Sequence, residues 1–282
     1  MPPPEIQHLQ SDARPAFTTL AREVDWGMTA ADVDPVFELG EVFGALGPRG
    51  ELWAAAALFP CGDLAAIGMM MVRPSLQRRG FGRRVIDACL QALPAKTPVT
   101  LVSSPAGLGF YRRLGFVDAG TVHKLVVPRA LGSRGMPGLE RVRALETEDW
   151  GPLLRWDREV FGADREALLR TRAESPATSA VLLDPGGALE GYALGTVQQG
   201  LLMLGPVVAP DLEGALALIH TLGHLTRHGA RIDVPGHQPG LLARLNAWGF
   251  VQTYASPAML LNARDYPGLR PCVFGLGSQM YG

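Results

Sequence analysis

The sequence is poor in lysine, in cysteine and in long apolar runs. Lys96 and Lys124 are its only lysines, and arginine supplies the other basic side chains; we interpret this as a bias of genome composition. The three cysteines, Cys61, Cys89 and Cys272, are far apart and indicate reduced thiols rather than a disulfide framework. No apolar run reaches the roughly 18 residues that a membrane span requires, so we expect no membrane partner.

An excess of charge of either sign is also absent. The 26 lysine and arginine residues are balanced by 27 acidic residues, which leaves a formal net charge of −1. A protein that binds nucleic acid through phosphate groups is usually more basic, so we expect no nucleic-acid partner. The N-terminal residues "MPPPEIQHLQSD" lack the basic segment followed by an apolar segment that marks a signal peptide. With reduced thiols, this predicts a cytoplasmic protein.

What is present suits a folded chain of two domains. Apolar residues make up 47% of the 282 residues and charged residues 19%, a composition typical of proteins with a filled core. The stretch "PRALGSRGMPG" (128–138) is rich in proline, glycine and arginine and has no periodicity, which is typical of a linker. We therefore expect domains at residues 1–130 and 138–282.

The residues before and after this stretch predict the same order of strands and helices. The first half predicts strands at 6–10, 41–46, 51–59, 64–72, 98–104 and 116–127, and helices at 15–24, 31–39, 81–93 and 107–114. The second half begins at 139–145 and predicts strands at 179–184, 189–197, 201–209, 231–235 and 250–261, and helices at 150–162, 164–172, 213–229 and 240–249. This order predicts a tandem repeat of one α/β domain.

The most informative stretch is "VRPSLQRRGFGRRVIDACL" (72–90), where a strand turns through a basic loop into a helix. A helix N-terminus has unpaired backbone N–H groups and partial positive charge, which together favour phosphate. Gly80 and Gly82 would let the backbone approach a diphosphate closely. The alternative is an ordinary turn before a solvated basic helix. The stretch is neither a G-x-G-x-x-G fingerprint nor a P-loop, since no G-K-[ST] follows.

Two motifs of the first half resemble signatures of the GNAT superfamily of acetyl-CoA-dependent N-acetyltransferases. "VRPSLQRRGFG" (72–82) is similar to the signature V-x-P-x-x-[QR]-x-x-G-x-G, and "GFYRRLGF" (109–116) to a second one. The resemblance implies a mixed, mostly antiparallel sheet flanked by helices in each domain, splayed between its fourth and fifth strands. It implies acetyl-CoA as the co-substrate. The cofactor-binding residues that it implies are Met71, Val72, Gln77, Arg78, Arg79, Gly80, Phe81, Gly82 and Arg83.

Acetyl transfer to an amine needs a stabilised oxyanion and an acid for the departing thiolate. A backbone N–H near Val72 is the candidate oxyanion donor. The resemblance makes Tyr111 the candidate general acid; the alternative is that Tyr111 only packs beneath the sheet. The general base stays open, because Asp25, Asp32, Glu38, Glu41 or a water chain could serve.

The second half resembles the degenerate C-terminal GNAT-like domain of a bacterial tandem family. The matching pieces are 157–165, 205–211, 233–236, 248–250 and 272–278. When the halves are aligned at their Gly-Phe pairs, Asp211 and Glu213 lie opposite Gln77 and Arg79, Leu216 opposite the second glycine, and Leu245 opposite Tyr111. Acidic side chains would repel a diphosphate. We therefore expect one acetyl-CoA site per chain, in the first half.

The acceptor amine is not identified by the sequence. The fifth strand lacks the aspartate that the family often has near its end, since the chain has "LVSSPAG" (101–107) there. Candidate substrate residues are Trp26, Glu41, Asp157 and Asp164, although Trp26 could instead pack and Asp164 could cap the helix that follows it. His220, His224 and His228 recur every four residues, but without an H-E-x-x-H pattern we expect no metal site.

We therefore expect an N-acetyltransferase that moves an acetyl group directly to a small primary amine, as a monomer or a homodimer. The second half would close or shape the acceptor pocket. Two alternatives remain open at this point, a non-catalytic acyl-CoA-binding regulatory protein and a scaffold without a ligand.

Overall fold

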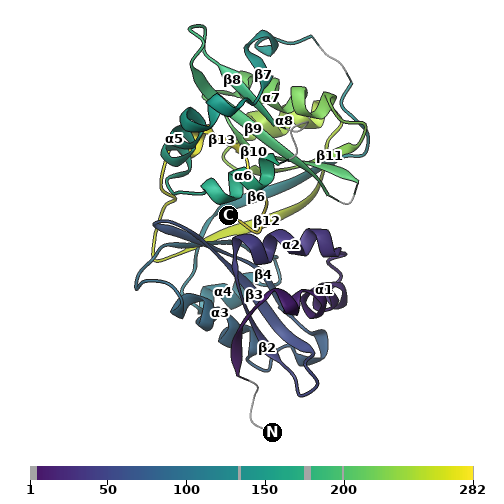
Figure 1. The fold of residues 1–282 in the computed structure, drawn as a ribbon, viewed down its shortest axis with the longest axis vertical. Coiled ribbons are helices and arrows are strands. Elements are labelled where there is room, and N and C mark those ends of the chain that lie inside the picture. Colours follow the sequence, from purple (N-terminus) through teal and green to yellow (C-terminus); the bar gives the residue numbers. More distant parts are fainter. Residues whose placement is uncertain (1–4, 133–134, 175–178, 199, 282) are drawn as a thin grey trace. The chain divides into compact units, whose positions relative to one another are not determined.

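The computed structural model describes residues 5–132, 135–174, 179–198 and 200–281. Contacts between residues divide the chain into two compact units, of which the first ends at Leu101 and the second begins at Val102. Most elements of both units are labelled in Figure 1. The expected domain limits, 1–130 and 138–282, rest on the repeated order of elements and stay a prediction.

The first unit is a sheet with three helices. Its strands are β1 (Ile6–Leu9), β2 (Glu41–Leu46), β3 (Leu52–Cys61), β4 (Leu64–Val72) and β5 (Val99–Val102), and its helices are α1 (Arg14–Glu23), α2 (Ala30–Leu39) and α3 (Phe81–Gln91). The strands lie in chain order; the first four are antiparallel, and β4 and β5 are parallel. Residues 54–58 of β3, mostly alanine, are buried without interruption, so both faces of this strand are covered.

The second unit has a larger sheet. Its strands are β6 (Val117–Val127), β7 (Val142–Ala144), β8 (Ser179–Leu183), β9 (Leu189–Gln198), β10 (Leu201–Val208), β11 (Gly229–Pro235), β12 (Val251–Leu261) and β13 (Val273–Gly275). Its helices are α4 (Leu108–Arg113), α5 (Trp150–Phe161), α6 (Glu166–Ala173), α7 (Leu212–His224) and α8 (Pro239–Ala247). The strand order is β12-β6-β11-β10-β9-β8-β7, and only the β10–β11 pair of this order is parallel among the described residues. The predicted mixed, mostly antiparallel sheets flanked by helices are confirmed.

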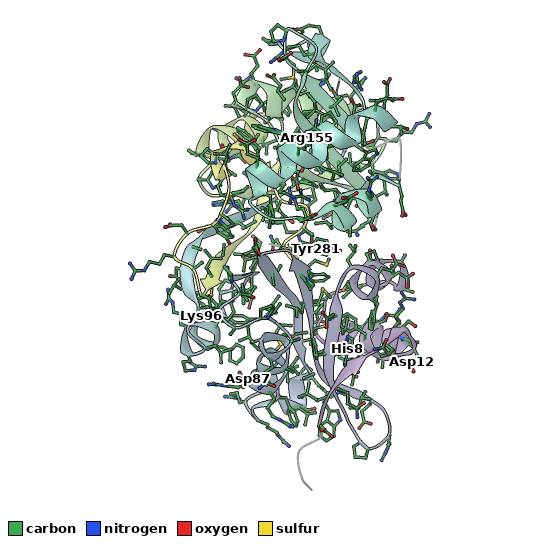
Figure 2. The ribbon with its side chains drawn as sticks, turned by 60° about the vertical axis from the view of Figure 1, so that its left-hand side comes forward. His8, Asp12, Asp87, Lys96, Arg155 and Tyr281 are labelled. Atoms are coloured by element: carbon green, nitrogen blue, oxygen red, sulfur yellow. The ribbon has the colours of Figure 1, made fainter. Side chains whose placement is uncertain are left out.

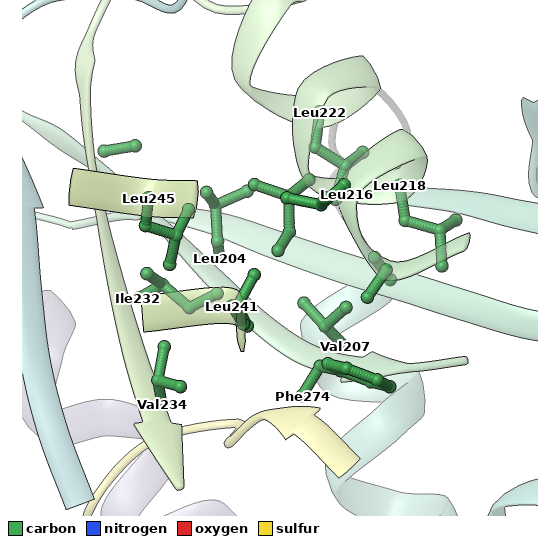
Figure 3. Close-up of a cluster of buried hydrophobic side chains, with 14 of the residues drawn as sticks. Leu204, Val207, Leu216, Leu218, Leu222, Ile232, Val234, Leu241, Leu245 and Phe274 are labelled. Carbon is green, nitrogen blue, oxygen red and sulfur yellow. The ribbon is translucent and has the colours of Figure 1, made fainter. Parts of the chain in front are cut away.

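The core of the second unit lies between this sheet and helices α7 and α8. Figure 3 shows leucines of both helices facing side chains of β10 and β11, with Phe274 of β13 beside Val207. Leu125 of β6 belongs to the same buried cluster. Burial of this apolar stripe, rather than helix propensity, accounts for most of the stability of such helices.

Three sequence predictions differ from the structure in this unit. The helix predicted at 213–229 ends at His224, because Thr226 Oγ1 accepts a hydrogen bond from the His228 amide (3.1 Å) and so competes with helical pairing. Strand β13 was not predicted, since three residues are too few for a periodic signal. In the expected linker, residues 133–134 lie outside the described residues, and Leu131 is buried in the core cluster. No described helix has the length and apolar character needed to span a membrane.

Candidate functional site

The first unit opens between β4 and β5. The parallel pairing joins Ala65 to Val99 and Ala66 to Thr100, whereas β4 continues to Val72. Over these last residues, the edge of β4 that faces away from β3 is not paired with β5 among the described residues. Backbone N–H and C=O groups along such an edge can bind an extended ligand as a further strand would. The short pairing supports the splay predicted between the fourth and fifth strands, which stays a prediction.

An irregularity of β4 lies at this opening. Met69 has φ +54°, and the pairing with β3 shifts between Ala55–Met71 and Ala57–Gly68. Between these pairs, two residues of β4 (69 and 70) lie opposite one residue of β3 (Ala56). This arrangement is a β-bulge. A bulge bends its strand and redirects the groups that follow it, here Met71, which is buried, and Val72, which is half-buried.

The loop after β4 presents the start of α3 without a cap. Gly80 is the N-cap residue with φ +85°, and no side chain caps the helix in this described segment. The first hydrogen bond of the helix is donated by the Arg84 amide to the Gly80 oxygen (3.2 Å). The amides of residues 81–83 precede that bond and point out of the helix end. Glycine is suited to this position because its φ is positive and because a Cβ there would meet open space.

The side chains of the loop divide into two groups. Arg78, with φ +61°, and Arg79 are exposed, whereas Gln77 donates from Nε2 to the Val72 oxygen (3.3 Å) and fastens the loop to β4. Phe81 is buried against Trp53, with ring centroids 5.4 Å apart. Gln77 and Phe81 therefore position the loop, and among these four residues only the two arginines extend their charge into solvent.

Two arginines of the first turn of α3 add further charge. Arg83 Nε lies 3.3 Å from Asp87 Oδ2, one turn later (Asp87 is labelled in Figure 2). Arg84 Nη1 is buried and has no hydrogen-bond partner among the described residues. A buried donor without a partner is costly, and an anion at this helix end would supply the acceptor. The uncapped amides, the open position at Gly80 and the orphaned Arg84 donor together fit a bound diphosphate.

The acidic and aromatic candidates of the first unit have separate surroundings. Trp26, which follows α1, is 43% exposed and so packs less than a core residue would. Glu41 is the first residue of β2 and is half-buried. Asp32 accepts hydrogen bonds from the Thr29 amide (2.9 Å) and hydroxyl (2.8 Å) in a capping box at α2. The capping box gives Asp32 a structural role, so its presence does not require a catalytic function.

Tyr111 belongs to α4 in the second unit. Its side chain is buried, and its ring lies edge-on to those of Phe110 (centroids 5.0 Å apart) and Phe116 (5.7 Å). Its backbone oxygen accepts from the Phe116 amide (3.1 Å), and its own amide donates to the Gly107 oxygen (3.1 Å). The sequence "GFYRRLGF" therefore forms a short helix that fixes the position and the plane of the Tyr111 ring.

The corresponding helix end of the second unit is closed. Asp211 is the N-cap of α7, and its Oδ1 accepts a hydrogen bond from the Gly214 amide (2.8 Å). The carboxylate thus occupies the position at which α3 leaves its amides open. The acid expected from sequence to repel a diphosphate also takes one of the donors that a diphosphate would use.

The opening between parallel strands is closed in this unit as well. β10 and β11 pair from Leu201 to Leu204, and beyond that point β13 pairs with Val207 and Val208 of β10. The Leu276 amide then donates to the Asp233 oxygen on β11 (2.9 Å). The segment 273–276 therefore fills the space between β10 and β11 (Figure 3).

Asp157 lies in a buried network. Arg165 donates to both of its carboxylate oxygens, at 2.7 Å and 2.9 Å, and Tyr192 donates to Oδ1. Burial by itself would lower the pKa of Arg165, but Asp157 and Tyr192 raise it above its ordinary value. Burial, followed by the Asp157 charge, raises the pKa of Tyr192. Both carboxylate oxygens of Asp157 therefore have hydrogen-bond partners inside the second unit. A structural role, which joins α5 to β9 and to the start of α6, explains this residue without a substrate.

Asp164, the neighbouring candidate, is exposed. Its Oδ1 accepts from the Glu166 amide (3.0 Å), and Oδ2 pairs with Arg158. The first of these bonds satisfies the first amide of α6, but the N-cap residue is Arg165, so Asp164 stands one residue before the predicted capping position. The Glu166 amide and Arg158 together hold the pKa of Asp164 below its usual value.

We expect Asp157→Asn to lower the free energy of unfolding by about 3–5 kcal/mol, because it leaves the Arg165 charge buried without its anion. Asp164→Asn is the matched control and should cost less than about 1 kcal/mol, since asparagine also caps helices and the Arg158 pair is exposed. Urea unfolding followed by circular dichroism measures both values. Unchanged stability of the Asp157 variant with altered acceptor preference would instead favour a substrate role.

The three histidines of α7 and its following turn do not form a cluster. The rings of His220 and His224 are stacked with centroids 5.8 Å apart, and that of His220 lies edge-on to Trp248. His228 lies beyond the end of α7. In the described part of the chain no group of three or more potential metal ligands is found.

Two parts of the chain match known family descriptions. Residues 38–118 and residues 153–275 each match a family described as "Acetyltransferase (GNAT) domain". The chain is also 28% identical over 243 residues to the uncharacterized N-acetyltransferase YitH of Bacillus subtilis (strain 168), covering 86% of each chain.

Solved structures show the same fold. A putative acetyltransferase from Pyrococcus horikoshii superposes with a TM-score of 0.80 at 20% identity, covering 99% of this chain and 95% of the other. A tandem GNAT protein from the clavulanic acid biosynthesis pathway superposes with a TM-score of 0.66 at 15% identity, covering 93% and 99%. At these identities the likeness concerns the fold.

Proposed function

Because this chain belongs to the GNAT acetyltransferase family, with two such domains in tandem, we propose that its first unit binds acetyl-CoA and that the chain acetylates a primary amine of a small molecule. GNAT domains use acetyl-CoA as co-substrate, and acetyl transfer is the general activity of the family. The observation that supports the proposal is the start of α3, where an uncapped helix end, Gly80 with its positive φ and the arginines of the loop offer donors suited to a diphosphate.

Each part of the site has a proposed task. The amides of residues 78–83 and the arginines of the loop hold the pyrophosphate. The open edge of β4 at Met71 and Val72 binds the pantetheine portion by backbone hydrogen bonds, and an amide near Val72 stabilises negative charge on the thioester oxygen. Bound acetyl-CoA supplies the activated acetyl group. Tyr111 donates a proton to the departing sulfur.

The second unit is proposed to bind no CoA. Asp211 occupies the end of α7, and the segment 273–276 fills the space between β10 and β11. A diphosphate there would have to displace a carboxylate, and a pantetheine chain would have to displace β13. One acetyl-CoA per chain is therefore the expected stoichiometry.

Direct transfer of the acetyl group to the amine, without an acetylated cysteine as intermediate, is the proposed route. Cys89, the cysteine of α3, is unsuited to carry an acetyl group. Its side chain is buried on α3, and burial raises the pKa of its thiol to about 12. The thiolate is the nucleophilic form, so Cys89 should stay unmodified by iodoacetamide at pH 8 in the folded protein. The half-buried Cys272 is an internal comparison. Mass spectrometry of native and urea-treated samples checks this, and rapid native labelling of Cys89 would contradict it.

A non-catalytic acyl-CoA-binding regulator is the alternative. The distinguishing experiment follows thiol release from acetyl-CoA in the presence of spermidine, glucosamine, lysine or tyramine, with mass spectrometry of the acetylated product. Acetyl-CoA-dependent product from any amine supports the enzyme. Saturable acetyl-CoA binding without product from a wide amine panel would favour the regulator.

A further inference from the structure

A cavity of about 370 Å³ lies within the second unit. Its walls come from β6 (residues 119–123), from the end of β11 and the turn after it (235–237), and from the segment that carries Tyr266 and Arg270. Most of the lining is apolar or backbone. The volume is within the range of sites for small organic molecules, and His237 on the rim is exposed.

Arg270 is held rigidly in the wall of this cavity. Its guanidinium carbon lies 4.4 Å from the ring centroid of Phe161 and 4.4 Å from that of Tyr266. Its Nε donates to the Pro267 oxygen (3.0 Å), and its backbone oxygen accepts from His237 Nε2 (2.8 Å). Two aromatic faces and a hydrogen bond therefore fix the plane of the guanidinium before any ligand arrives.

Arg270 has no salt bridge among the described residues, and Asp157, which raises its pKa, acts on it only from beyond salt-bridge distance. The Nη2 atom of Arg270 is buried and has no hydrogen-bond partner among the described residues. The described residues that line the cavity include no aspartate or glutamate. Burial, and after it the charge of Arg165, lower the pKa of Arg270 to about 10, so the group remains a cation at neutral pH.

Arg165 is a buried arginine whose charge is paired within the protein, and it serves as a comparison for Arg270. It lies over the same Phe161 ring, at 4.0 Å, and is paired with Asp157 through two carboxylate oxygens. A buried cation is stabilised by such a pair and is costly without one. Arg165 is paired directly with Asp157, whereas Arg270, which is half-buried, has no direct carboxylate partner among the described residues and can accept one from a ligand in the cavity.

We propose that the cavity binds a small molecule through a carboxylate group, with the Arg270 guanidinium as the cation that attracts it and the apolar walls around the rest of the molecule. A single guanidinium in a largely apolar cavity suits one negative charge better than the two of a phosphate monoester. The cavity holds further polar groups for orientation: His123 donates from Nδ1 to Gln252 Oε1 (2.8 Å) and lines the site beside Thr121. The inference does not depend on acetyl-CoA binding, since every residue that carries it belongs to the second unit.

Calorimetric titration of the full chain tests the proposal with hexanoate, 3-phenylpropanoate and leucine as probes. We expect at least one to bind saturably, and 3-phenylpropanamide to bind at least tenfold more weakly than 3-phenylpropanoate. Arg270→Gln should weaken carboxylate binding at least tenfold. Arg244→Gln, which removes an exposed arginine of α8, should leave it unchanged. Absence of binding by all three probes, or equal binding by the Arg270 variant, would overturn the proposal.

A second variant guards against misfolding of the first. Ala119→Leu keeps Arg270 and fills the cavity from β6, so it too should weaken 3-phenylpropanoate binding at least tenfold. Tighter binding of phenyl phosphate than of 3-phenylpropanoate would overturn the assignment to a carboxylate. Acetyl-CoA affinity should stay unchanged in both variants. If Arg270→Gln loses that affinity as well, its fold is damaged and the Ala119 titration decides.

Discussion

Gly82→Glu should weaken acetyl-CoA binding about 100-fold, which corresponds to about 2.8 kcal/mol. The new carboxylate would lie in the first turn of α3, where the proposed diphosphate carries charge of the same sign. A glutamate at this end of a helix is favourable for the helix itself, so the loss of binding should occur without loss of stability. Calorimetric titration of acetyl-CoA, with thermal unfolding of the same samples, measures both.

Gln91→Glu is the control for charge on α3. It adds the same charge to the same helix at an exposed position at the opposite end, and it should leave acetyl-CoA binding within about twofold. Wild-type protein should bind one acetyl-CoA per chain. Two sites per chain would show that the second unit binds despite Asp211 and β13, and equal affinity of the Gly82 variant would contradict the proposed phosphate site.

Tyr111→Phe should lower kcat for acetyl transfer about 100-fold or more, with little change in acetyl-CoA affinity. Removing a general acid typically costs 10²–10⁴ in rate, while phenylalanine preserves the ring contacts with Phe110 and Phe116. The measurement is thiol release with the best amine of the panel, together with calorimetric titration of acetyl-CoA.

Tyr254→Phe is the matched control, because it removes the same hydroxyl from a tyrosine of β12 that is 46% exposed. It should leave kcat unchanged. A Tyr111 variant with wild-type kcat would show that Tyr111 packs only, as the alternative interpretation has it. A parallel loss of kcat and of thermal stability would assign the effect to the fold.

Much of the first unit could be predicted because its signals are local. The strand at 64–72 coincides with β4, and the basic loop leads into α3, which buries Val85, Ile86 and Cys89 at a spacing typical of one helix face. The positive φ of Gly80 also follows from residue type. The roles of the cofactor loop and of Tyr111 nevertheless stay predictions, since they depend on a bound co-substrate.

The hydrogen-bond and ion-pair partners of individual side chains could not be predicted from the sequence. Gln77 was expected as a donor to phosphate, yet in the structure it binds the Val72 oxygen. Asp157 and Asp164 are both acids of one short segment, but one lies in a buried ion pair and the other binds the first amide of α6 at the surface. Spacing along the chain does not distinguish these cases, because Arg165 lies close in sequence to both acids, and Tyr192, which donates to Asp157, comes from a distant strand.

The sequence by itself determined the family, the order of the longer strands and helices, and the position of the basic loop before α3, because each depends on residue type and on spacing over a few residues. Only the tertiary structure decided that β13 fills the space between β10 and β11, and that Arg270 lines a cavity whose described walls include no aspartate or glutamate. Both features join segments far apart in the chain. A three-residue strand and a single arginine carry no local pattern, so their meaning appears only when packing brings their neighbours together.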